Sequence, residues 1–98
     1  MELYVLNVDI FRDLSMLTGV QIRSARAALG WSVDDLADKA GVATKTIRRL
    51  ESVDGIPQSR TGTLLEIKVI FESAGIEFIG SPTDRPGIRV VSRRQSTE

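Results

Sequence analysis

The chain has 98 residues, of which 42% are hydrophobic and 27% charged, and it contains neither cysteine nor histidine. This length and composition indicate one small globular domain, with or without terminal arms. The missing residue types exclude thiol and imidazole nucleophiles, Cys/His zinc sites and disulfides. No pair of acidic residues stands in a recognisable catalytic context. We therefore expect no enzymatic activity, no cofactor and no bound metal.

Thirteen basic and thirteen acidic residues give a net charge of zero. This balance argues weakly against a nucleic-acid-binding protein, but the charges alternate in blocks. Residues 19–30, 41–60 and 80–98 are each net positive, and the stretches between them are net negative. A folded chain could gather the positive blocks on one face. No apolar run is long enough to span a bilayer and the N-terminus is unlike a signal peptide, so we expect a cytoplasmic protein without membrane contact.

A capping box predicts the first clear helix, over about residues 18–30. The hydroxyl of Thr18 can cap the helix, and the amide of Gln21 can return a bond three residues later. Gly30 can end the helix, because glycine readily adopts the positive φ found there. The apolar positions between them recur at helical spacing: Ile22, Ala25 and Leu29.

Two further short helices follow in quick succession. Ser32 begins the first, with acidic residues in its opening turn, and Gly41 ends it. The second runs over about residues 43–52 and carries aliphatic residues on one side. Its other side is cationic, with Lys45, Arg48 and Arg49.

The C-terminal third changes its periodicity. Thr63 and Glu66 form another capping pattern, which predicts a fourth helix from Thr63 to its close at Gly75. Residues 76–79 and 88–91 then alternate as short strands do. The eight residues between them are rich in glycine and proline, so we predict a β-hairpin with a longer loop.

The N-terminal segment fits two patterns. We favour a strand or extended arm over residues 3–8 and a short helix over 10–17. The predicted layout has four parts, namely an arm that can serve dimerisation (1–17), a helical domain (18–75), a β-hairpin (76–92) and a flexible tail (93–98).

The most informative unit is residues 31–51, where two short helices meet at a tight turn. This arrangement predicts a helix-turn-helix, with the cationic face of the second helix free to enter a DNA major groove. The segment resembles the lambda-repressor/Cro-like (XRE) helix-turn-helix family over roughly residues 18–75. The matching positions are Leu36-Ala37, Gly41-Val42, Thr46-Ile47 and Leu50-Glu51, with Arg26 upstream.

The resemblance implies a mainly α fold. We expect a four- to five-helix lambda-repressor-like domain with a C-terminal β-hairpin, which an N-terminal strand can join. It also implies that residues 43–52 form the recognition helix of a DNA-binding transcriptional regulator, which reads a short operator in double-stranded DNA. No small-molecule ligand is evident.

The resemblance also implies roles for single residues. Arg26 and Glu51 match a family pair that forms an internal salt bridge. Base edges would be read by Thr44, Lys45 and Arg49. Phosphates would be contacted by Ser32 with the amides that follow it, Thr46, Arg48 and Arg60.

Two positions depart from the family pattern. Ala43 stands where a Ser or Thr often caps the recognition helix, and such a hydroxyl contributes about 1 kcal/mol. Val33 stands where a Gln often contacts a phosphate. Both losses weaken the DNA interpretation without refuting it.

The hairpin has apolar residues on both faces, and a two-stranded hairpin alone is marginal in water. We therefore predict a homodimer that uses the terminal segments, with Tyr4, Leu6, Ile79 and Val91 on the dimer or partner surface. The alternative is a three-stranded sheet that covers only its own core.

Two other functions stay open. The fold can serve as a protein-interaction module, such as an anti-activator that sequesters another regulator. The net charge of zero, Ala43, Val33 and the apolar terminal strands fit that interpretation. An antitoxin that binds a toxin and represses its own operon is the other alternative.

Overall fold

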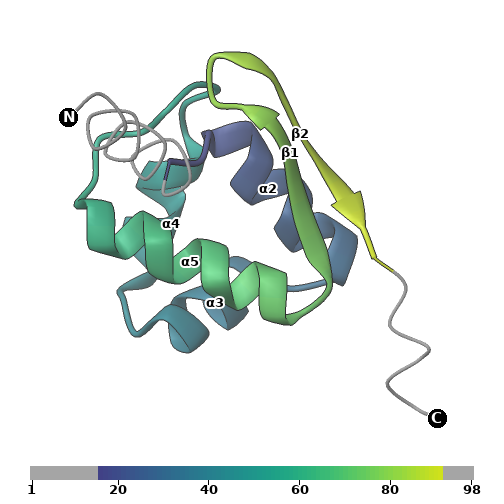
Figure 1. Ribbon diagram of the computed structural model, residues 1–98. Helices are drawn as coiled ribbons and strands as arrows, with labels where there is room; N and C mark the ends of the chain where they lie inside the picture. The colour runs from purple at the N-terminus through teal and green to yellow at the C-terminus, as the bar shows by residue number, and fades with distance from the viewer. Residues whose placement is uncertain (1–15, 92–98) are drawn as a thin grey trace, which may run out of the picture.

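The computed structural model describes residues 16–91, and the tail predicted at 93–98 lies outside this range. Four helices are followed by a two-stranded antiparallel hairpin (Figure 1). The elements are α2 (Gly19–Leu29), α3 (Val33–Ala40), α4 (Thr44–Glu51), α5 (Thr61–Ser73), β1 (Ile76–Ser81) and β2 (Asp84–Val90). The predicted mainly α fold with a C-terminal hairpin is confirmed.

The first two helices begin at the capping residues that the sequence indicates. The hydroxyl of Thr18 accepts a hydrogen bond from the backbone N–H of Gln21, and the side chain of Gln21 accepts one from the backbone N–H of Thr18. Gly30 then ends α2 in the left-handed region, at φ 71°. The start and end of α2 therefore follow from local chemistry.

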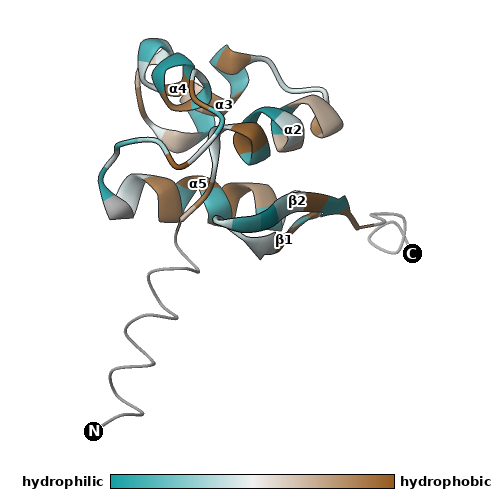
Figure 2. Cartoon of the chain, turned by 90° about the horizontal axis from the view of Figure 1, so that it is seen from above, coloured by the Kyte–Doolittle hydropathy of each residue, from teal (hydrophilic) through white to brown (hydrophobic). Residues whose placement is uncertain are grey.

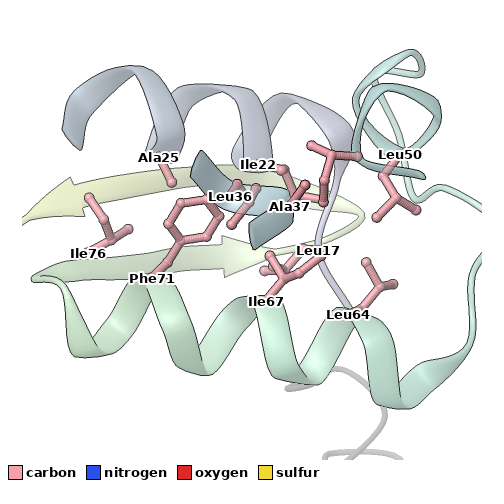
Figure 3. Packing of buried hydrophobic residues seen from close by; sticks show 11 residues of the cluster. Leu17, Ile22, Ala25, Leu36, Ala37, Leu50, Leu64, Ile67, Phe71 and Ile76 are labelled. Carbon is pink, nitrogen blue, oxygen red and sulfur yellow. The ribbon is translucent and has the colours of Figure 1, made fainter. Parts of the chain in front are cut away.

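The core lies between α5 and the other helices (Figure 3). Phe71, Ile67 and Leu64 project from one side of α5 toward Ile22 and Leu36. Leu17, which directly precedes the N-cap residue Thr18, is also buried in this cluster. The core therefore includes a residue that lies outside the helices. Trp31 stacks on Phe71 with ring centroids 5.6 Å apart. Among residues 16–91, the buried apolar residues are Leu17, Ile22, Ala25, Leu36, Ala37, Ile47, Leu50, Leu64, Ile67, Phe71 and Ile76.

Helix α5 starts earlier than its capping pattern predicts. Arg60 occupies the N-cap position with no side-chain cap, and the prediction of a capping box at Thr63 is wrong. Thr63 lies inside the first turn, where its backbone N–H donates to the carbonyl of Arg60. A Thr-x-x-Glu pattern makes a local cap possible, but here the backbone of Arg60 already starts the helix.

The hairpin strands are longer than predicted, and the turn between them is only Pro82 and Thr83. The prediction of a long loop is wrong because a bulge keeps Gly80 within β1. Ile79 pairs with Gly87 and Ser81 with Asp84, so β2 holds one extra residue in this stretch. Gly80 has a φ of 72°, and a Cβ there would lie 2.1 Å from the carbonyl oxygen of Arg85.

The hairpin lies against α2 and α5. The amide of Gln21 donates to the carbonyl of Gly87 at 3.0 Å, and Phe78 packs edge-on against Phe71. One face of the hairpin therefore closes the core. Within residues 16–91, no helix is long and apolar enough to cross a membrane.

Candidate nucleic-acid interface

A three-residue turn joins α3 to α4. Gly41 adopts φ 69° and ψ 32°, and its backbone N–H donates to the end of α3. The N–H of Val42 donates to the carbonyl of Ala37 at 3.0 Å, which closes the turn. Because Gly41 reverses the chain so tightly, α4 packs directly against α3.

Helix α4 has one buried face and one exposed cationic face. Ile47 and Leu50 are fully buried. Lys45, Arg48 and Arg49 are all exposed, at the positions that the sequence indicates. In Figure 2, α3 and α4 lie on the side of the molecule opposite α5 and the hairpin. The cationic face of α4 is therefore open to a partner.

The C-terminal end of α4 is fixed by an ion pair with α2. Arg26 Nε lies 2.8 Å from Glu51 Oε2, and Arg26 Nη2 lies 2.9 Å from Glu51 Oε1. The third nitrogen, Nη1, donates to the carbonyl of Trp31 at 3.0 Å. The hydrogen bond with Glu51 raises the pKa of Arg26. The Glu51 side chain is only 7% exposed, so this pair is largely shielded from water.

The N-terminal end of α4 is fixed differently. Ala43 occupies the N-cap position and provides no side-chain bond, as its residue type dictates. Thr44 does not replace the missing cap. Its hydroxyl donates instead to Asp34 Oδ1 on α3, at 2.7 Å. The start of α4 therefore depends on a contact with the neighbouring helix. On the Thr44 side chain, the methyl group and the acceptor lone pairs of the hydroxyl stay available to a ligand.

Arg49 contacts the segment that follows α4. Its Nη1 donates to the backbone carbonyl of Gln58 at 2.7 Å. A guanidinium carries five N–H donors, so this bond leaves most of the group available to a ligand. The same bond limits the directions in which those remaining donors can point.

The first turn of α3 carries both a capping box and negative charge. The Ser32 hydroxyl accepts from the N–H of Asp35, and the Ser32 N–H donates to the Asp35 carboxylate. This backbone hydrogen bond, with a smaller contribution from the Ser32 hydroxyl, lowers the pKa of Asp35. An open cleft of about 650 Å³ between α3 and α4 is lined partly by Asp34, Asp35 and Asp38. Within residues 16–91, no group of acidic side chains is arranged to hold a metal ion.

The remaining predicted site residues are spread over the surface. Thr46 is half-buried, and Arg60 is exposed beside a hollow that Ala40 and Val42 also line. Ile79, half-buried in β1, and Val91, exposed directly after β2, lie on the hairpin and not in the interface around α4. The predictions for Tyr4 and Leu6, for the strand over 3–8 and for most of the helix over 10–17 concern residues outside those that the structure describes.

The comparison with known families agrees with this geometry. The family model described as Helix-turn-helix matches residues 22–61, from within α2 to the first residue of α5. Residues 22–61 form a helix-turn-helix domain of the lambda-repressor-like (XRE) family. At the level of the family, this helix-turn-helix domain is a DNA-binding regulatory module. A search of curated proteins returned no match to the chain.

Sequence reasoning missed the contacts of three residues around this helix-turn-helix domain. They are the bond from Thr44 to Asp34, the bond from Arg49 to the Gln58 carbonyl, and a set of contacts from Arg23 to the residues after α4. Arg23 stands one helical turn before Arg26, and that spacing is the only signal in the sequence that could have indicated it.

Proposed function

We propose that this protein is a cytoplasmic, sequence-specific DNA-binding transcriptional regulator, which reads a short operator through the exposed face of α4. The observation that carries the proposal is the cationic face of α4 within a helix-turn-helix domain. A recognition helix of this kind places its outward side chains against base edges in the major groove.

Three residues are proposed to read bases. Lys45 and Arg49 carry donors that suit guanine O6 and N7. Arg49 is the more specific of the two, because its planar guanidinium can form a bidentate pair of hydrogen bonds with one guanine. The Thr44 hydroxyl already donates a hydrogen bond to Asp34, so the proposed role of Thr44 is a methyl contact with thymine.

Four positions are proposed to contact phosphates, namely Thr46, Arg48, Arg60 and the first turn of α3 at Ser32. The Ser32 site is the least favourable of the four. The capping box already uses the Ser32 N–H and hydroxyl, and the carboxylates of Asp34 and Asp35 oppose a phosphate there.

We test the proposal with purified protein and the DNA upstream of its own gene, against random DNA of equal length, at two salt concentrations. Wild type should prefer one sequence and should lose affinity steeply with salt. Lys45→Ala and Arg49→Ala should each cost about 1–3 kcal/mol on the preferred site and relax specificity. If both variants bind that site as wild type does, α4 is not the reading helix.

We also propose that the protein acts as a homodimer, because operator affinity usually needs two half-sites about one helical turn apart. The outer part of the hairpin around Ile79 and Val91 is the proposed contact, together with the N-terminal segment. Light scattering after size exclusion tests this at micromolar concentration. A single species of 10.8 kDa, the mass of one chain, would contradict it.

A second candidate function is binding to a protein partner through α5. This helix carries apolar residues on its outer side as well as its core side, and a helix apolar all round is usually buried. Leu65, Val69 and Ile70 line an outer groove of about 330 Å³. Val69 is 51% exposed there. If a protein partner is the main target, Val69→Asp abolishes function in cells while Arg49→Ala does not.

A further inference from the structure

The side chain of Arg23 binds the segment that directly follows α4. Its Nη1 donates to the backbone carbonyl of Glu51 and, at 3.4 Å, to that of Val53. Its Nη2 lies 2.9 Å from Asp54 Oδ1. One guanidinium thus connects α2 to three residues within the stretch 51–54. We call this set of contacts the Arg23 clamp.

The clamp acts on the end of α4. Glu51 is the last residue of that helix, and its carbonyl is one of the four at a helix C-terminus that have no partner within the helix. A cation beside those carbonyls is favourable because the helix dipole is negative there. Arg23 therefore provides both a hydrogen bond and a charge of the right sign at the end of the proposed recognition helix.

A second contact holds the same loop against α2. The backbone N–H of Gly19 donates to the carbonyl of Gly55 at 2.8 Å. A Cβ on Gly19 would lie 1.8 Å from the carbonyl oxygen of Val53, so the two backbones approach as closely as glycine allows. Pro57, further along the loop, is buried. The loop is therefore held at Val53 to Gly55 and is buried again at Pro57, directly before Gln58.

This loop returns to the exposed face of α4. The carbonyl of Gln58 accepts the hydrogen bond from Arg49 Nη1. The position of that carbonyl depends on how the loop is held, and the direction of the Arg49 guanidinium depends on the carbonyl. A chain of contacts therefore runs from Arg23 on α2, through the loop, to Arg49.

We propose that Arg23 is a positioning residue for DNA reading, which orients the guanidinium of Arg49 through the loop 52–58 without touching DNA itself. This inference rests on the proposed function. The Arg23–Asp54 ion pair is exposed, with side chains 39% and 88% accessible, and such pairs contribute little to stability. Loss of the clamp should therefore change how Arg49 is presented more than it changes the fold.

The test compares variants for binding to the preferred DNA site and to random DNA across a salt series. Arg23→Met keeps the aliphatic stem and removes every donor, while Arg23→Lys keeps the charge but cannot reach all three acceptors. Arg85→Met is the matched control, because Arg85 also forms an exposed ion pair, 3.2 Å from Asp84 at the start of β2. Thermal unfolding of each variant reports whether the fold is kept.

Both Arg23 variants should lose about fivefold or more of the ratio of specific to random binding, the lower end of what one bidentate base contact provides. Arg85→Met should keep that ratio. Combining Arg23→Met with Arg49→Ala should give no further loss beyond Arg49→Ala alone, because the two residues act through one contact. Asp54→Ala, at a side chain too exposed to disturb the core, should give a smaller loss in the same direction.

Wild-type selectivity in Arg23→Lys, or additive losses in the double variant, would overturn the positioning role. In that case the proposed function still stands, since wild type and Arg49→Ala differ. A wild-type protein with no preference between the DNAs would overturn the proposed function and this inference together.

Discussion

The two helices of the helix-turn-helix, α3 and α4, are both eight residues long, yet they are stabilised in different ways. Helix α3 has a complete capping box at its start and a left-handed glycine at its end. Helix α4 has an uncapped alanine at its start, and its ends are held by Asp34, Arg26 and Arg23 on other helices. Local sequence therefore defines α3, whereas tertiary contacts define α4. This difference suits a helix whose outer face is free for a ligand.

The largest expected effect is at the C-terminal end of α4. Glu51→Ala should lower the free energy of unfolding by about 3 kcal/mol, because it leaves the guanidinium of Arg26 without its buried partner. Chemical denaturation measures the change. Asp54→Ala is the control, since Asp54 is also in an ion pair but is 88% exposed. Equal losses in the two variants would contradict the claim that α4 depends on the buried pair.

Removing the cap of α3 should have a smaller effect. Ser32→Ala should lower the free energy of unfolding by about 1 kcal/mol, because the N–H of Asp35 loses its acceptor. The same denaturation experiment measures it. Ser24→Ala, within α2, has no capping role and is the matched control. A Ser32→Ala variant as stable as wild type would show that tertiary contacts, and not the local cap, define α3.

Supplying the missing cap of α4 should stabilise the protein. Ala43→Ser should raise the free energy of unfolding by about 0.5–1 kcal/mol, because the backbone at Ala43 is already extended as a cap requires. Ala27→Ser, exposed in the interior of α2, should instead be slightly destabilising. A destabilised Ala43→Ser variant would mean that the start of α4 has no room for a local cap.

The smallest expected effect is a pH dependence at the start of α3. The folded protein holds the pKa of Asp35 below its usual value, so the charged carboxylate contributes stability above the unfolded pKa, near 4. That contribution is lost as the pH falls through the lower folded pKa. The difference in melting temperature between wild type and Asp35→Asn should therefore be present at pH 7 and shrink as the pH falls below the unfolded pKa. A difference that stays constant as the pH falls through the acidic range would contradict this assignment.

The sequence predicted what local chemistry determines. Thr18, Ser32, Gly30 and Gly41 indicated the limits of α2 and α3, because caps and left-handed glycines act within a few residues. The family pattern also indicated Arg26 with Glu51 and the exposed cations of α4.

The sequence could not predict contacts that depend on the path of the chain. Arg23 reaches residues 28 to 31 positions away, and Arg49 bonds to a backbone carbonyl that no residue type specifies. The hairpin turn was misjudged for a related reason. A glycine at position 80 is compatible both with a bulge inside a strand and with a loop. Only the pairing register with β2 distinguishes the two.

The most direct test of DNA reading by α4 is to select preferred sequences from a random pool of double-stranded DNA with wild type and with Arg49→Ala. We expect wild type to enrich a short motif that contains guanine, and Arg49→Ala to enrich the same motif without its preference at one guanine position. No enriched motif with wild type, or an identical motif with both proteins, would contradict the proposal that the exposed face of α4 reads DNA.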